Sequence, residues 1–148
     1  MNIQSQFGEE KHVIKQLDLF LSQGVIEEDE YYDIRTAVTE ACLNAMEHGN
    51  HLQPYLPVRI HFEWLKSRLI IIVKDCGKGF WKIPANRADD RGWGLPFIHH
   101  LMDYCTYYID LTDRCFCLHM EKELKNRLRQ EGLSHGYSRG IANQGQNK

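Results

Sequence analysis

The stretch EACLNAMEHGN, residues 40–50, decides how the rest of the chain is interpreted. Small and apolar residues recur in it at helical spacing, so it predicts the last turns of a helix that ends near position 48. Glu40, Asn44 and His48 lie four positions apart, and such side chains share a helix face. From one of these residues to the next, the direction around the helix axis turns by ~40°. The line therefore runs from the border of the apolar face into that face. The helix alone leaves two interpretations open, a site facing the core or a polar flank with a capping histidine.

The composition is that of one soluble globular domain. The chain has 148 residues, of which 43% are hydrophobic and 26% charged, enough to enclose a sizeable core. The net charge of −2 argues against a general affinity for nucleic acid, and the longest strongly apolar run, residues 69–73, is too short to span a membrane. The N-terminus lacks the features of a signal peptide, so we expect a cytoplasmic protein.

The five cysteines are expected to be reduced thiols, because no export signal is visible. Cys115 and Cys117 fall on one face of a predicted strand, and with Cys105 and His119 they offer a possible zinc site. The paired CxxC motifs of zinc knuckles are missing, so small buried thiols are the favoured interpretation.

The order of elements predicts an α+β fold with two layers. Helices come first, then two strands, one helix and a hairpin, which indicates a mostly antiparallel or mixed sheet with helices on one face. The expected elements are an edge strand within 1–7, helices at 8–22 and 27–48, strands at 59–65 and 68–75, a helix at 96–104, and hairpin strands at 105–111 and 115–123. We place the domain at 1–124 and predict that the polar, basic tail, 125–148, is disordered.

A second informative stretch is DCGKGF, residues 75–80. Asp75 ends a predicted buried strand, and a carboxylate there can accept a hydrogen bond from the amino group of a base. Gly77 and Gly79 let the backbone turn sharply and approach a ligand closely. The spacing fits neither an EF-hand nor a Walker P-loop, and on its own it is equally typical of a hairpin turn.

A third stretch, RGWGLP at residues 91–96, opens a predicted helix. Free backbone amides at a helix start, with Gly92 and Gly94 allowing close approach, suit a phosphate chain. Arg91 stands next to them and could meet a terminal phosphate. Alone, this pattern is also typical of a flexible loop.

Together and in this order, the three stretches resemble the nucleotide-binding boxes of the Bergerat-fold, or GHKL, ATPases. Residues 40–49 look like the N box, 75–80 like the first glycine box and 92–95 like the second. The pattern EAxxNAxxHG most resembles that of the small bacterial anti-sigma-factor serine/threonine kinases. The resemblance covers roughly residues 7–123 and implies a Bergerat-type sandwich that binds ATP and Mg²⁺.

The resemblance also implies a role for each polar residue. Glu40 would be the general base that takes a proton from an attacking hydroxyl, and Asn44 would hold Mg²⁺. Asp75 would bind the adenine amino group. His48 has no catalytic part in this scheme, and we expect it to close the helix against the core.

The glycine boxes would surround the nucleotide. Gly77 and Gly79 would shape the wall beside the base, and the backbone at Gly92 and Gly94 would reach the phosphates. Arg91 would meet the γ-phosphate.

Two departures from the family pattern stand out. The segment between the glycine boxes, 81–91, is short, so any lid is expected to be small. The Gly-Thr that often precedes the last strand is replaced by Asp113-Arg114, which leaves open whether Thr112 or Cys115 makes the base contact.

The implied function is an ATP-dependent serine/threonine-protein kinase of the anti-sigma-factor type. It would phosphorylate a STAS-domain anti-anti-sigma partner and bind a sigma factor, with homodimerisation possible and no direct contact to nucleic acid or membrane. The alternative is a non-catalytic ATP-binding switch that controls partner binding. A sensor histidine kinase is disfavoured, because no phospho-acceptor histidine box precedes the N box.

Overall fold

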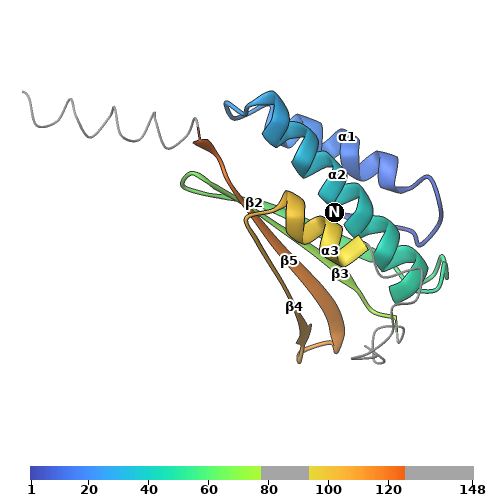
Figure 1. Cartoon of the computed structure of the whole chain (residues 1–148). Coiled ribbons are helices and arrows are strands. Elements are labelled where there is room, and N and C mark those ends of the chain that lie inside the picture. Colours follow the sequence, from blue (N-terminus) through green and yellow to red (C-terminus); the bar gives the residue numbers. More distant parts are fainter. Residues whose placement is uncertain (78–93, 126–148) are drawn as a thin grey trace, which may run out of the picture.

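The computed structural model describes residues 1–77 and 94–125 and arranges them as helices on one face of a sheet (Figure 1). Its elements follow the predicted order, with bounds that differ by a few residues. They are β1 (Asn2–Ile3), α1 (Glu10–Leu21), α2 (Glu28–Asn44), the π-helical turn η1 (Ala45–Gly49), β2 (Val58–Leu65), β3 (Arg68–Asp75), α3 (Gly94–Leu101), β4 (Tyr104–Asp110) and β5 (Cys115–Glu123).

The sheet has five strands in the order β1-β2-β3-β5-β4, and every pairing is antiparallel. The predicted α+β sandwich is confirmed. Either a mostly antiparallel or a mixed sheet was expected, and the sheet is antiparallel. In the central strand, Leu69, Ile71 and Val73 are buried beneath the helices, and Asp75 continues their alternation. Because alternate side chains share a face, Asp75 lies on the helix side of the sheet.

The helices cover that face with apolar stripes. Val13, Leu17 and Leu21 of α1 are buried, and α2 contributes Ile34 and Val38 to the same core. Burying a side chain of this size stabilises the fold by about 1.5–3 kcal/mol relative to exposure. None of the helices in the described part of the chain has the length and apolar character needed to cross a membrane.

The end of the N-box helix differs from the prediction of one α-helix running to His48. The α-helix ends at Asn44 and the chain continues as a π turn to Gly49, closed by the Asn50 backbone N–H donating to the Ala45 carbonyl at 2.8 Å. A π turn holds more residues than an α turn, so the α-helical spacing assumed for the predicted line ends at Asn44. Glu40 and Asn44 lie on the α-helix, as the predicted line requires, and His48 lies in the π turn.

The expectation that all five cysteines are reduced is wrong, because Cys76 and Cys115 form a disulfide. The ladder between β3 and β5 ends with Asp75 opposite Phe116, which places the two cysteines across from each other at the next position. Cys42, Cys105 and Cys117 are free thiols, of which only Cys105 is partly exposed. The sequence could not show the pairing, since it depends on the register of two strands that are far apart along the chain.

Candidate functional site

Asp75 is the most unusual polar residue of the described chain. Its side chain is 1% exposed, and its Oδ1 atom has no hydrogen-bond partner among residues 1–77 and 94–125. Burial raises the pKa of this carboxyl to about 7, although a hydrogen bond from the Gly77 backbone acts in the opposite direction. A buried oxygen without a partner is costly and marks a position where a ligand donor can bind.

Two glycines make room for this carboxyl. A Cβ atom on Gly49 would lie 2.3 Å from Asp75 Cγ, and one on Gly77 would lie 1.7 Å from the Gly49 carbonyl oxygen. Any larger residue would therefore push the π turn away from the end of β3. The sequence singled out Gly77 but assigned Gly49 only to a helix end, although Gly49 is the last residue of the N-box pattern.

Asn50 connects this contact to the rest of the fold. It is fully buried, and its Oδ1 accepts a hydrogen bond from the Cys76 backbone N–H at 3.1 Å. Its Nδ2 donates to Ser5 Oγ at 2.9 Å and to the Leu56 carbonyl at 3.0 Å. Sequence analysis missed this residue, because an asparagine after a helix is an ordinary turn residue until its three partners are known.

An aromatic surface stands beside Asp75 on the same face of the sheet. Phe116 is its direct cross-strand partner, and directly opposed residues share a face. The Phe116 ring stacks on Tyr107 of β4 with ring centroids 5.8 Å apart. A flat apolar wall next to a hydrogen-bond acceptor is a suitable environment for a heteroaromatic base.

Comparison with known proteins assigns the family. The histidine kinase-like ATPase domain matches residues 8–122, which is most of the chain. The chain belongs to the histidine kinase-like ATPase family. No curated protein sequence matches it.

Two solved structures share the fold of this histidine kinase-like ATPase domain. One contains the RsbU and RsbW domains of Rv1364c from Mycobacterium tuberculosis, with a TM-score of 0.59 and 17% identity. The other is the histidine kinase domain of the blue-light activated histidine kinase from Erythrobacter litoralis EL346, with a TM-score of 0.53 and 14% identity. The matches cover 84% and 67% of this chain but only 32% and 50% of those chains.

The two N-box residues of the histidine kinase-like ATPase domain lie one helical turn apart at the end of α2. Glu40 and Asn44 are both half-buried, and Asn44 Nδ2 has no hydrogen-bond partner in the described part of the chain. Asn44 directly precedes the π turn whose last residue, Gly49, contacts Asp75. The carboxamide oxygen of Asn44 is of the kind that Mg²⁺ prefers, whereas the unpartnered Nδ2 is a donor that would need an acceptor.

The remaining predicted residues are only partly covered by the structure. Gly94 is the first residue of α3, which packs against α2. Gly79, Arg91 and Gly92, like the short segment at 81–91, lie outside the described residues, so their proposed roles stay predictions.

The structure places both residues considered for the missing Gly-Thr contact at the hairpin between β4 and β5. Thr112 is exposed in the hairpin turn and hydrogen-bonds the Asp110 carboxylate, and Cys115 is held in the disulfide. His48 is half-buried in the π turn, and its expected structural role stays a prediction.

Proposed function

We propose that this histidine kinase-like ATPase is a serine/threonine-protein kinase of the anti-sigma-factor type. It would use ATP to phosphorylate a STAS-domain anti-anti-sigma protein, and it would bind a sigma factor. The observation that carries the nucleotide site is the buried Asp75 carboxyl with its unpartnered oxygen. The N-box pattern around Glu40 and Asn44 supports the choice of reaction.

Adenine supplies what Asp75 lacks. Leaving a buried acceptor without a hydrogen bond costs roughly 1–3 kcal/mol, and the exocyclic amino group of adenine can donate to it. Gly49 packs directly on the carboxyl and Gly77 packs on the Gly49 carbonyl, and the wall formed by Phe116 and Tyr107 offers a face for the ring.

Phosphoryl transfer requires mainly positioning, a proton acceptor and neutralisation of charge. Glu40 can accept the proton of a serine or threonine hydroxyl, because it lies half-buried on α2 one turn before Asn44. Asn44 would hold Mg²⁺, which neutralises phosphate charge when bound. Gly79, Gly92 and Arg91 are proposed to contact the nucleotide, with Arg91 at the γ-phosphate.

The partner assignment rests on the resemblance of residues 40–49 to the N box of anti-sigma-factor kinases. The fold shared with a structure that includes an RsbW domain agrees with it. A homodimer and a cytoplasmic location belong to the same proposal.

The experiment is a transfer assay with the full chain, Mg²⁺, radiolabelled ATP and the STAS-domain protein encoded beside it. Wild type is compared with Glu40→Gln and with Glu47→Gln, an exposed glutamate of the π turn that serves as the matched control. ADP binding is measured in parallel by calorimetry. We expect label on a serine or threonine of the partner with wild type and Glu47→Gln, and loss of about 10²-fold or more with Glu40→Gln at unchanged ADP affinity.

Two outcomes contradict parts of this proposal. Clear ADP binding without transfer to any STAS-domain partner rejects the kinase and favours the ATP-dependent binding switch. Absence of ADP binding by the folded protein rejects the nucleotide site itself.

A further inference from the structure

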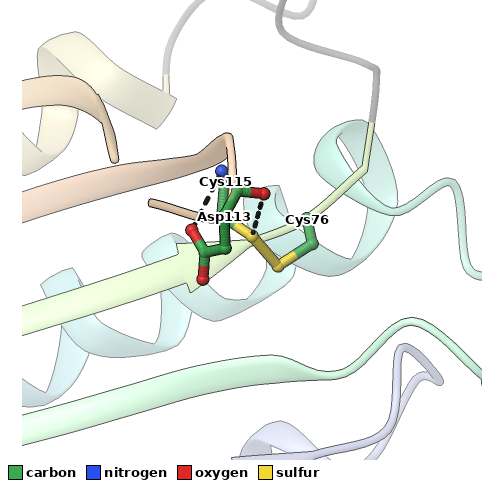
Figure 2. A group of neighbouring side chains, drawn as sticks. All are labelled: Cys76, Asp113 and Cys115. Atoms are coloured by element: carbon green, nitrogen blue, oxygen red, sulfur yellow. Dashed lines mark hydrogen bonds between the residues drawn. A yellow bond between two sulfur atoms is a disulfide. The ribbon is translucent and has the colours of Figure 1, made fainter. Parts of the chain in front are cut away.

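Figure 2 shows the disulfide between Cys76 and Cys115. Cys76 is the residue that follows Asp75, which carries the proposed adenine-binding carboxyl. The two cysteines extend the ladder between β3 and β5 by one position beyond Asp75 and Phe116, with Cα atoms 4.3 Å apart. Cys115 and Phe116 are neighbours on β5, so their side chains point to opposite faces of the sheet. The covalent link therefore lies behind the surface on which the base would rest.

The backbone of Cys76, the residue after Asp75, is restrained from two directions. Its N–H donates to Asn50 Oδ1 at 3.1 Å, and the following residue, Gly77, packs against the Gly49 carbonyl. These contacts hold the turn from the side of the helices. The disulfide holds it from the side of β5, so breaking the disulfide removes the only covalent restraint that the described residues place on this turn.

The surroundings of the two sulfur atoms suit reversible exchange. Cys76 is half-buried, whereas Cys115 is 2% exposed, so Cys76 is the more exposed residue of the pair. Cys115 Sγ lies 3.7 Å from the Asp113 carbonyl oxygen, which can accept a hydrogen bond from the thiol once the disulfide is reduced (Figure 2). Attack on the sulfur of Cys76, the more exposed residue, would release Cys115 as the leaving thiol.

The three other cysteines are poor competitors for this chemistry. Burial raises the pKa of Cys42 to about 12 and that of Cys105 to about 11, and it also raises the pKa of Cys117. Thiols with a raised pKa stay protonated at neutral pH, and the thiolate is the reactive form.

The sulfur atoms and the Asp113 carboxylate lie within 4.8 Å of one another, which also resembles a partial metal site. The carboxylate is already bound, however, by Lys74 at 2.8 Å and Arg59 at 3.0 Å. The sulfur atoms are bonded to each other. These contacts favour thiol–disulfide exchange over metal binding.

We infer that Cys76 and Cys115 form a reversible thiol–disulfide modification site that sets the affinity for adenine nucleotides. The oxidised pair fixes the turn that follows Asp75, and the reduced pair releases it; the inference rests on the proposed nucleotide site. The oxidant is a small-molecule disulfide such as glutathione disulfide. One cysteine thiolate attacks it and releases one thiol, and the second cysteine attacks the mixed disulfide and releases another. Two electrons and two thiol protons thus pass from the protein to the reagent.

The test uses the full chain in two redox states. One sample is oxidised with glutathione disulfide and the other is reduced with dithiothreitol. Alkylation of free thiols in denaturant, followed by intact mass measurement, should find three free cysteines in the first sample and five in the second. ADP titration of the same samples should show roughly two- to tenfold weaker binding after reduction, the cost of ordering a turn and a side chain on binding.

Variants separate this pair from a general effect of reductant. The double variant Cys76→Ser with Cys115→Ser should bind ADP with the affinity of the reduced wild type under both conditions. Cys105→Ala, which removes a free and partly exposed cysteine, should keep the full response.

Equal ADP affinity in two samples whose masses prove the redox change overturns the inference and leaves the nucleotide site standing. No ADP binding in either state overturns both. Stoichiometric zinc retained by the reduced protein, and lost in the double variant, would replace the redox site with a metal site.

Discussion

Asp75 should make the nucleotide-free protein less stable as the pH rises. Burial raises the pKa of this carboxyl from 3.8 to about 7 in the folded chain. Between these values the folded state keeps a proton that the unfolded state has released, so the stabilisation is complete below pH 3.8 and is lost as the pH rises through about 7. At about 1.4 kcal/mol for each pH unit between the two pKa values, the loss is at most on the order of 4 kcal/mol.

The assay is urea unfolding of the oxidised, nucleotide-free chain at several pH values from about 5 to 8, the window in which Asp75 titrates on folding. Asp75→Asn cannot ionise, so it should lose this component of the pH dependence and exceed wild type in stability at the upper end. Asp110→Asn is the matched control. Hydrogen bonds from Lys74 and Thr112 hold the pKa of Asp110 below its usual range, so its stabilisation is lost only as the pH falls through acid values.

The unfolding free energy of Asp110→Asn should therefore change with pH in parallel with that of wild type over the whole window. That of Asp75→Asn should diverge steadily from wild type. If Asp75→Asn also runs parallel to wild type, Asp75 is ionised in the folded state. The argument for an unsatisfied buried carboxyl then fails.

Three further perturbations test the construction of the site. Gly77→Ala places a Cβ 1.7 Å from a backbone oxygen, so we expect it to lower the unfolding free energy by roughly 1–3 kcal/mol and to weaken ADP binding. Gly24→Ala is the control, because its nearest contact is 3.4 Å away and its effect on unfolding should be small. Asn50→Ala removes three hydrogen bonds and should cost roughly 2–4 kcal/mol in urea unfolding, with Gln53→Ala, a partly buried neighbour, as the control. Reduction of the disulfide, which closes a loop with a sequence separation of 39, should lower the unfolding free energy by about 4 kcal/mol in wild type and not in the Cys76→Ser and Cys115→Ser double variant.

Much of the fold could be predicted because it depends on local periodicity. The apolar run in 68–75 predicted a buried strand that ends at Asp75, and the pattern of 8–22 predicted the helix that became α1. Glu40 and Asn44 were placed correctly on one helix face for the same reason. These features need no knowledge of distant contacts.

The details that the sequence missed all depend on contacts between distant segments. The π turn ends where Gly49 packs on Asp75, a contact that spans 26 positions and leaves no local pattern. Asn50 acquires its role only when Ser5 and Leu56 are brought beside it. The disulfide likewise requires the register of β5 on β3, which neither strand specifies by itself.

The same distant contacts explain how the fold can tolerate the buried carboxyl. The turn after Asp75 is restrained by packing of Gly77 on the π turn, by the amide of Asn50 and by the disulfide to Cys115. Each restraint opposes the local opening through which water would otherwise reach Asp75 Oδ1 and satisfy it. Loosening any one of them should therefore partly hydrate the carboxyl, lower its pKa and reduce the pH dependence of stability. The redox state, the Asn50 amide and the glycine contact should all act on ADP binding through this one carboxyl.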